Sequence, residues 1–379
     1  MDLLVTADRI LTPEEALQPG WLQVKDGLIA GIGSGRPTQR PDWHATTLTP
    51  GLVDTHVHGG GGASFSTISD DEAALAALVH HRAGTTSLVA SLVSAPVPTL
   101  VAQLATLADL CEDGILAGIH LEGPWLSPTH RGAHDLRHLA RGNPLDATGR
   151  SAVESLVAAG RGHLRMVTIA PEIPGGLDVL RAFVEAQVLV AIGHTAADTP
   201  TVHAAIEAGA RIATHLFNGM PPLHHRYPGP VGVLLAEPSV TVELIADGVH
   251  VAPAALALAA RAAGPTRVSL VSDAMSACGS PDGRYVLGST PVVVSDGVAR
   301  VTPSGALAGA TRPLAHGMRT LYAVGLPLAD AVTAATATPA RSLGLWRRGR
   351  LVVGAPADLV ALDADLAVER VLRGGAWVN

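Results

Sequence analysis

Six residues that could bind a metal ion or move a proton stand at or near the end of apolar runs. They are His56, His58, Glu122, His194, His215 and Asp273. Zn, Fe, Mn, Co and Ni all accept imidazole and carboxylate ligands, so the set predicts a transition-metal site without selecting the metal. A divalent ion bound there would lower the pKa of its water from about 15.7 to about 7, which favours hydrolysis at neutral pH.

The first of these groups is an HxH pair, His56 and His58. Alternate residues of a strand point to the same face, so both rings could reach one ion; two surface histidines in a turn are the alternative. Glu122 lies between an apolar run and the break Gly123-Pro124. Its carboxylate could bridge two ions, and a helix cap or a salt bridge is the alternative.

His194, His215 and Asp273 follow three later runs. A single histidine at a strand end is more often structural, but two on consecutive runs, together with the HxH pair, favour a metal site. Asp273 could ligate an ion, and it could also take a proton from water and pass it to a leaving amine. A helix N-cap is the alternative for this aspartate.

Eight apolar runs, separated by mostly helix-like, Ala-rich segments, must position these residues. Near-continuous Val, Ile and Leu runs alternating with helices predict a parallel sheet covered by helices. Eight such units predict a (β/α)8 TIM barrel, whose active site lies at the C-terminal ends of its strands. A doubly wound open sheet is the structural alternative. The runs are 51–59, 85–94, 115–123, 163–172, 187–195, 210–218, 239–250 and 267–275.

Both ends of the chain differ from this middle part. Residues 1–49 and 345–379 contain short alternating runs and glycine turns, which are typical of β-structure. We therefore expect one small β-sandwich domain built from both termini. Residues 50–344 would form the metal-dependent catalytic barrel.

Composition excludes several classes of protein. The 379 residues are 47% hydrophobic and 16% charged, with a net charge of −7 and a pI of about 6.2, unlike a nucleic-acid-binding surface. Neither a cationic leader nor an apolar run long enough for a membrane span is evident, so we expect a cytoplasmic protein. Two cysteines, Cys111 and Cys278, cannot form an all-thiolate metal site.

The motifs DTHVHG, HLEGP, GHT, THLFN and VSDAM, in this order, resemble the amidohydrolase superfamily. More narrowly, the chain is similar to the N-acetylglucosamine-6-phosphate deacetylases over nearly its whole length. The segments that carry this resemblance are HLEGPWL (120–126), HRGAH (130–134), THLFNGMPPLHHR (214–226), ADGVH (246–250) and LAG (307–309). The closing segment 349–363 is shared across the superfamily and says nothing about the substrate.

The resemblance implies hydrolysis of the 2-acetamido group of N-acetyl-D-glucosamine 6-phosphate, with release of acetate. It implies that Glu122, His194 and His215 are the principal metal ligands. It also implies that Asp273 is the catalytic acid–base and that His134 assists at the substrate carbonyl.

The resemblance further implies a centre of one or two divalent ions and a homodimer. The HxH pair is retained here, so Glu122 would lie between two ions. Arg226 would reach the sugar phosphate from the neighbouring subunit. The substrate contacts implied in all are Ala133, His134, Asn218, Gly219, Arg226, His250, Leu307, Ala308 and Gly309.

Several alternatives remain open. A deacetylase of N-acetylgalactosamine 6-phosphate or another amidohydrolase would use the same residues, and a non-catalytic barrel scaffold would be expected to lose ligands. A centre bridged by a carboxylated lysine, as in enzymes resembling dihydroorotase, is excluded because the only lysine, Lys25, precedes the barrel.

Overall fold

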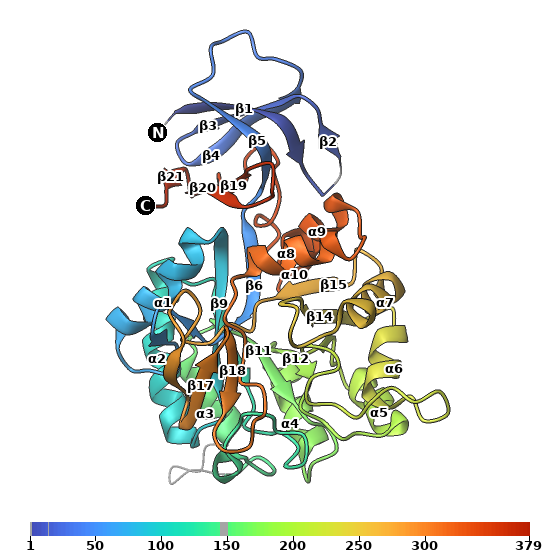
Figure 1. The fold of residues 1–379 in the computed structure, drawn as a ribbon. Coiled ribbons are helices and arrows are strands. Elements are labelled where there is room, and N and C mark those ends of the chain that lie inside the picture. Colours follow the sequence, from blue (N-terminus) through green and yellow to red (C-terminus); the bar gives the residue numbers. More distant parts are fainter. Residues whose placement is uncertain (1, 14, 145–150) are drawn as a thin grey trace.

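The computed structural model describes residues 2–13, 15–144 and 151–379. Figure 1 shows a large unit of strands and helices and a smaller sheet beside which both chain ends lie. Within these ranges no helix is both long and apolar enough to cross a membrane.

The large unit contains an eight-stranded parallel sheet in the order β15-β14-β13-β12-β11-β10-β9-β6. Each strand lies within one of the eight predicted apolar runs, so the predicted barrel is confirmed. Apart from the partly buried Leu189, the apolar side chains of these strands are buried because helices cover the outside of the barrel. The strands are β6 (Leu52–Val57), β9 (Thr85–Val93), β10 (Gly118–Glu122), β11 (Leu164–Ile169), β12 (Leu189–Ile192), β13 (Ile212–Ala213), β14 (Thr241–Ile245) and β15 (Val268–Val271).

The barrel closes where the first and last strands meet. Val57 and Ala274 form a parallel bridge. The backbone N–H of Asp273 donates to the carbonyl of His56 at 2.9 Å, and that of His58 donates to Ala274 at 2.8 Å. These bonds place the HxH pair directly beside Asp273, although more than 200 residues separate them.

Within the described residues, seven α-helices connect successive barrel strands and three more follow the last one. The first begins at Ser69, whose side chain accepts the N–H of Glu72, and it has an acidic first turn that suits the helix dipole. The helices are α1 (Asp70–Arg82), α2 (Val97–Glu112), α3 (Ala152–Ala159), α4 (Gly176–Glu185), α5 (Thr199–Glu207), α6 (Gly229–Ala236), α7 (Pro253–Ala263), α8 (Leu314–Ala323), α9 (Leu328–Ala335) and α10 (Ala337–Ser342); a short 3₁₀ helix, η1, spans Leu136–His138.

The smaller unit is a sheet in the order β21-β20-β19-β5-β1-β3-β4, with β2 paired to β1. Strands from both termini meet in it, as predicted, and a separate apolar core packs on it. The division at residues 49/50 and 344/345 stays a prediction. The strands are β1 (Leu3–Leu11), β2 (Ala16–Leu17), β3 (Gly20–Lys25), β4 (Leu28–Ser34), β5 (Trp43–Pro50), β19 (Leu359–Leu362), β20 (Val368–Arg373) and β21 (Ala376–Trp377).

An antiparallel insertion follows the eighth barrel strand and was not predicted. It consists of β16 (Gly283–Leu287), β17 (Thr290–Ser295) and β18 (Val298–Val301). Its buried side chains form a cluster with Val93 and Met275, which lie near the C-terminal ends of two barrel strands. The insertion therefore flanks the mouth of the barrel, as does the small hairpin of β7 (Gly59–Gly60) and β8 (Ala63–Ser64).

Candidate metal centre

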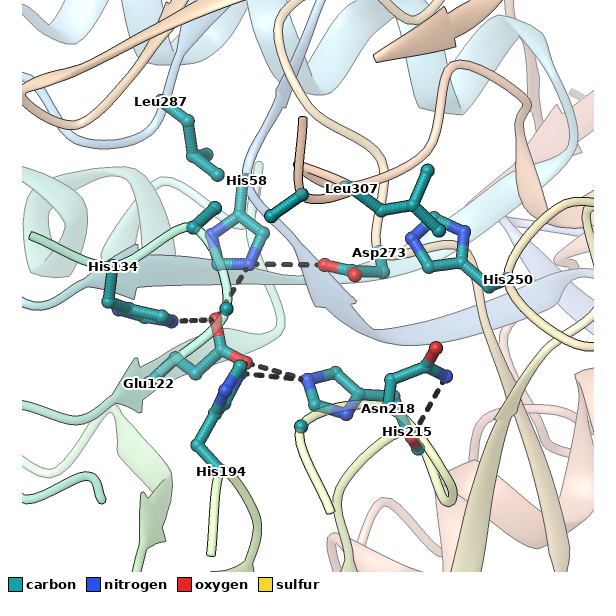
Figure 2. Close-up of a pocket in the computed structure, with 15 residues that line it drawn as sticks. His58, Glu122, His134, His194, His215, Asn218, His250, Asp273, Leu287 and Leu307 are labelled. Carbon is teal, nitrogen blue, oxygen red and sulfur yellow. Dashed lines mark hydrogen bonds and ion pairs between the residues drawn. The ribbon is translucent and has the colours of Figure 1, made fainter. Parts of the chain in front are cut away.

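A cavity opens at the C-terminal ends of the barrel strands, and Figure 2 shows most of its polar side chains pointing into it. In the described part of the chain no lysine or arginine lines this cavity. The lining residues are His58, Glu122, Gly132, Ala133, His134, His194, His215, Asn218, Gly219, His250, Asp273, Leu287, Ala306, Leu307 and Gly309.

The six predicted ligands come together in two groups of three. The atoms that each group offers an ion lie within 4.8 Å of one another, and all six residues are buried. The first group is His56, His58 and Asp273, and the second is Glu122, His194 and His215.

Backbone conformation directs three of these side chains into the cavity. His194, His215 and Asp273 have φ values of 46°, 26° and 49°, in or near the left-handed region that non-glycine residues rarely adopt. Each stands two positions after the last residue of a barrel strand. Strained backbone of this kind persists where the surroundings impose it, and it is concentrated at functional sites.

Glu122 joins the two groups because its two oxygens face different partners. Oε1 lies 3.0 Å from His194 Nε2 and 2.9 Å from His215 Nε2. Oε2 lies 3.2 Å from His58 Nε2 and 3.1 Å from His134 Nε2. This is the placement that a carboxylate between two ions requires.

The charges of the centre favour a cation. Burial lowers the pKa of His56, but Glu122 and Asp273 outweigh burial and raise its pKa well above the usual value. Burial would raise the pKa of Glu122, but the surrounding histidines, His56 first, hold its pKa well below the usual value. Because no arginine or lysine lines the described cavity, only protonated histidines or metal ions can balance the carboxylates. The donor set therefore fits divalent transition metals.

Hydrogen bonds from Nδ1 to backbone carbonyls outside the centre hold two of the histidine rings with Nε2 toward the centre. His58 Nδ1 lies 3.2 Å from the carbonyl of Ser91, and His194 Nδ1 lies 2.8 Å from that of His130. Because a carbonyl only accepts, each Nδ1 carries the proton and each Nε2 is free to bind an ion.

His134 is held as a neutral donor. The backbone N–H of Ser94 donates to its Nδ1 at 3.2 Å, so the ring carries its proton on Nε2. Burial outweighs the charge of Glu122 and lowers the pKa of His134 to about 4. At neutral pH this ring can donate a hydrogen bond to a substrate oxygen.

Most of the predicted substrate contacts line the cavity. His250 does so with its Nδ1 only 2.7 Å from Asp247 Oδ2, and Asn218 donates to the carbonyl of His215 at 3.1 Å. Ala308 is fully buried outside the lining, and Arg226 is exposed on the loop before α6. The structure therefore brings together Ala133, His134, Asn218, Gly219, His250, Leu307 and Gly309, but neither Ala308 nor Arg226.

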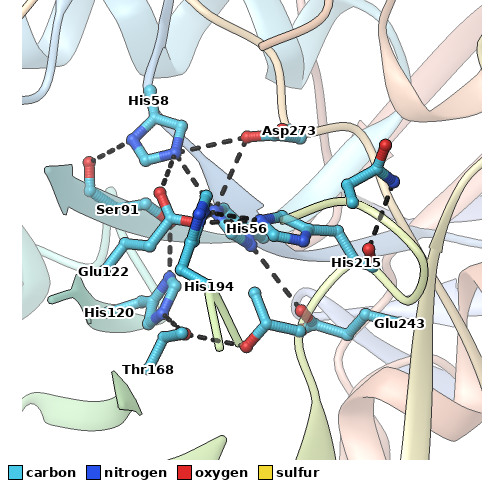
Figure 3. A network of polar contacts seen from close by, with 12 residues as sticks. His56, His58, Ser91, His120, Glu122, Thr168, His194, His215, Glu243 and Asp273 are labelled. Atoms are coloured by element: carbon cyan, nitrogen blue, oxygen red, sulfur yellow. Dashed lines mark hydrogen bonds and ion pairs between the residues drawn. The ribbon is translucent and has the colours of Figure 1, made fainter. Parts of the chain in front are cut away.

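Sequence reasoning missed two buried residues behind the ligands, as Figure 3 shows. His120 stacks edge-on against His56, with ring centroids 4.6 Å apart, and Glu243 faces His56 from the other side. His120 stands two residues before Glu122, so the alternation argument that found the HxH pair would also have found it.

Comparisons with known proteins show the family to which the chain belongs. Residues 47–378 match the amidohydrolase family. N-acetylgalactosamine-6-phosphate deacetylase of Escherichia coli O157:H7 is 38% identical over 98% of both chains. N-acetylglucosamine-6-phosphate deacetylase of Vibrio furnissii is 39% identical, over 98% of this chain and 94% of that one. The crystal structure of N-acetyl-D-glucosamine-6-phosphate deacetylase from Mycobacterium smegmatis is 45% identical, covers 100% of both chains and superposes with a TM-score of 0.94.

Proposed function

The chain belongs to the amidohydrolase family, and we propose that it hydrolyses N-acetyl-D-glucosamine 6-phosphate to D-glucosamine 6-phosphate and acetate. The observation that carries the proposal is the pair of three-residue groups joined by Glu122 at the mouth of the barrel. Relatives that match nearly the full chain are named as deacetylases of this substrate.

Two divalent ions would be held by the two groups, with Glu122 between them. Zn, Fe, Mn, Co and Ni all suit these ligands. Ions bound there would supply the Lewis acidity that polarises the acetamide carbonyl and activates water at neutral pH.

The protein's own proton transfers would fall to Asp273 and His134. Asp273 takes a proton from the attacking water and returns it to the amide nitrogen as the C–N bond breaks. His134 donates its Nε2–H to the carbonyl oxygen as negative charge develops there. One water is consumed, and the products are acetate and the free amine.

We further propose that a second copy of the chain completes the phosphate site. The described cavity lining contains no lysine or arginine, although a phosphate dianion needs a cationic partner. Arg226 is exposed on a loop, where it could reach the cavity of a neighbouring subunit. Replacement by alanine should mainly raise KM for the phosphorylated sugar, and equal use of phosphorylated and free sugar by the parent enzyme would contradict this role.

N-acetylgalactosamine 6-phosphate is the second candidate substrate. The observation in its favour is that the Escherichia coli relative named for this sugar is 38% identical, against 39% for the Vibrio furnissii relative. Sequence identity therefore does not separate the two epimers.

An acetate-release assay with both sugar phosphates and both free sugars tests these proposals. Asp273→Asn should retain the ion held by Glu122, His194 and His215 and lose about 100- to 10,000-fold in kcat. Asp296→Asn is a matched control because Asp296 also has a left-handed φ, 53°, but lies on the exposed turn between β17 and β18. Near-normal turnover by Asp273→Asn would refute the assigned role.

A further inference from the structure

Two buried polar atoms face each other behind the first group of ligands. In the described part of the chain, neither His56 Nδ1 nor Glu243 Oε2 has a hydrogen-bond partner. The two atoms lie 3.6 Å apart, and both side chains are almost completely buried. A buried polar atom without a hydrogen bond is destabilising. A shift of a few tenths of an ångström would bring His56 Nδ1 and Glu243 Oε2 within hydrogen-bond distance and satisfy both atoms.

A second contact anchors the carboxylate of Glu243. Thr55 Oγ1 donates to Glu243 Oε1 at 2.9 Å, which joins β14 to β6. Glu243 belongs to neither group of ligands and does not line the cavity. Figure 3 shows its carboxylate behind the His56 ring, on the side away from Asp273.

This arrangement distinguishes His56 from His58 and His194. His58 and His194 direct Nδ1 at neutral backbone carbonyls, whereas His56 directs it at a carboxylate. A carboxylate fixes the proton on Nδ1, leaves Nε2 free for the ion and makes the ring a stronger donor.

We propose that Glu243, anchored by Thr55, is a positioning residue that determines whether the ion position formed by His56, His58 and Asp273 is filled. The proposal rests on the two-ion centre proposed above. Because Glu243 touches only the first group, its loss should weaken one ion position and leave the position at Glu122, His194 and His215 unchanged.

The test measures metal binding rather than turnover. Parent, Glu243→Gln and Thr55→Val are loaded with Zn²⁺ or Co²⁺; metal per chain is counted after desalting, and each affinity is measured by chelator competition. Ser269→Ala is the matched control: Ser269 pairs with Glu243 in register on β15, and its buried Oγ has no partner among the described residues.

We expect Glu243→Gln to bind one ion about 10- to 100-fold more weakly and the other unchanged. Thr55→Val should show a smaller loss at the same position, and Ser269→Ala none. The absorption spectrum of bound Co²⁺ should differ between the parent and Glu243→Gln at one ion position only. If Glu243→Gln does not fold, as judged by circular dichroism, Thr55→Val carries the test.

The outcomes separate this proposal from the one on which it rests. A parent chain that binds no metal refutes the metal-dependent function itself. If the parent binds two ions and both affinities are unchanged in the variants, only the role of Glu243 is refuted. Equal weakening of both ions also refutes it, because a general disturbance of the barrel would then be the cause.

Discussion

His80 should make the protein lose stability in mild acid. It lies on α1 with no exposed surface, and its Nε2 donates to the carbonyl of Gly59 at 2.9 Å. Gly59 is the residue that follows His58 in the chain. Burial lowers the pKa of His80 from 6.5 to about 4, which outweighs the opposing effect of this hydrogen bond. Between pH 6.5 and about 4, His80 therefore stays neutral in the folded protein, whereas it is protonated in the unfolded chain.

The size of the effect follows from linkage. The histidine pKa is 6.5 when unfolded and about 4 when folded, and each pKa unit is worth about 1.4 kcal/mol, so His80 contributes at most ~3 kcal/mol to the pH dependence. Above pH 6.5 this stability is fully present, because both states are neutral. It declines as pH falls, by about 2 kcal/mol at pH 5, and is lost near pH 4.

Urea unfolding of His80→Gln at pH 7.5 and 5.0 measures this contribution. The glutamine amide can still donate to Gly59 but does not titrate. The free energy of unfolding should fall by about 2 kcal/mol less in the variant than in the parent between the two pH values. Metal-free protein is required, because release of bound metal on acidification would add its own pH dependence.

His203→Gln is the control, since His203 is exposed on α5 and should leave the pH dependence unchanged. Identical pH dependence in the parent and His80→Gln would show that the buried ring is not held neutral.

Two further predictions concern the cavity. In Gly219→Ala, at φ 63°, the new Cβ would lie 2.7 Å from His194 Nδ1 and break its outer hydrogen bond. Metal affinity should fall about 10- to 100-fold by chelator competition, whereas Gly374→Ala, at φ 56° with open space around the new Cβ, should leave it unchanged. Burial lowers the pKa of His250, but the hydrogen bond and charge of Asp247 outweigh this and raise it. Asp247→Asn should therefore shift the His250 limb of the KM–pH profile to lower pH with metal content unchanged; an unshifted limb would contradict the pairing.

The barrel could be predicted because its signal is local. Each strand is a short run of apolar residues, and burial on both faces of a parallel sheet needs no knowledge of the neighbours. The insertion β16–β18 carries a different local signal. In β17, Val292 and Val294 are buried while Val293 is exposed, the alternation of a strand covered on one face. That pattern could have been recognised, but its place beside the barrel mouth depends on long-range packing with Val93 and Met275.

The predicted ligands came from spacing and position, which are also local. Their geometry was not available from the sequence, since closure of the barrel is what brings His58 within 3.2 Å of Asp273. The placement of Glu122 between the two groups likewise depends on rings from three different strand ends, those of His58, His194 and His215. Arg226 is exposed on its loop and does not line the cavity, so its role at the sugar phosphate of a neighbouring subunit stays a prediction.

Glu243 and His120 point to a further rule for such barrels. Each interrupts an apolar strand, in TVELI and in GIHLE, where both faces of the sheet are buried. A charged or polar side chain there is destabilising unless it is hydrogen-bonded, so its presence implies partners inside the barrel. The sequence could therefore have marked both as polar groups serving the centre. It could not have named Thr55, 188 residues from Glu243, because that contact exists only when the first and seventh strands face the same interior. A polar residue within an apolar strand thus predicts a buried network, and the fold decides which ligand that network serves.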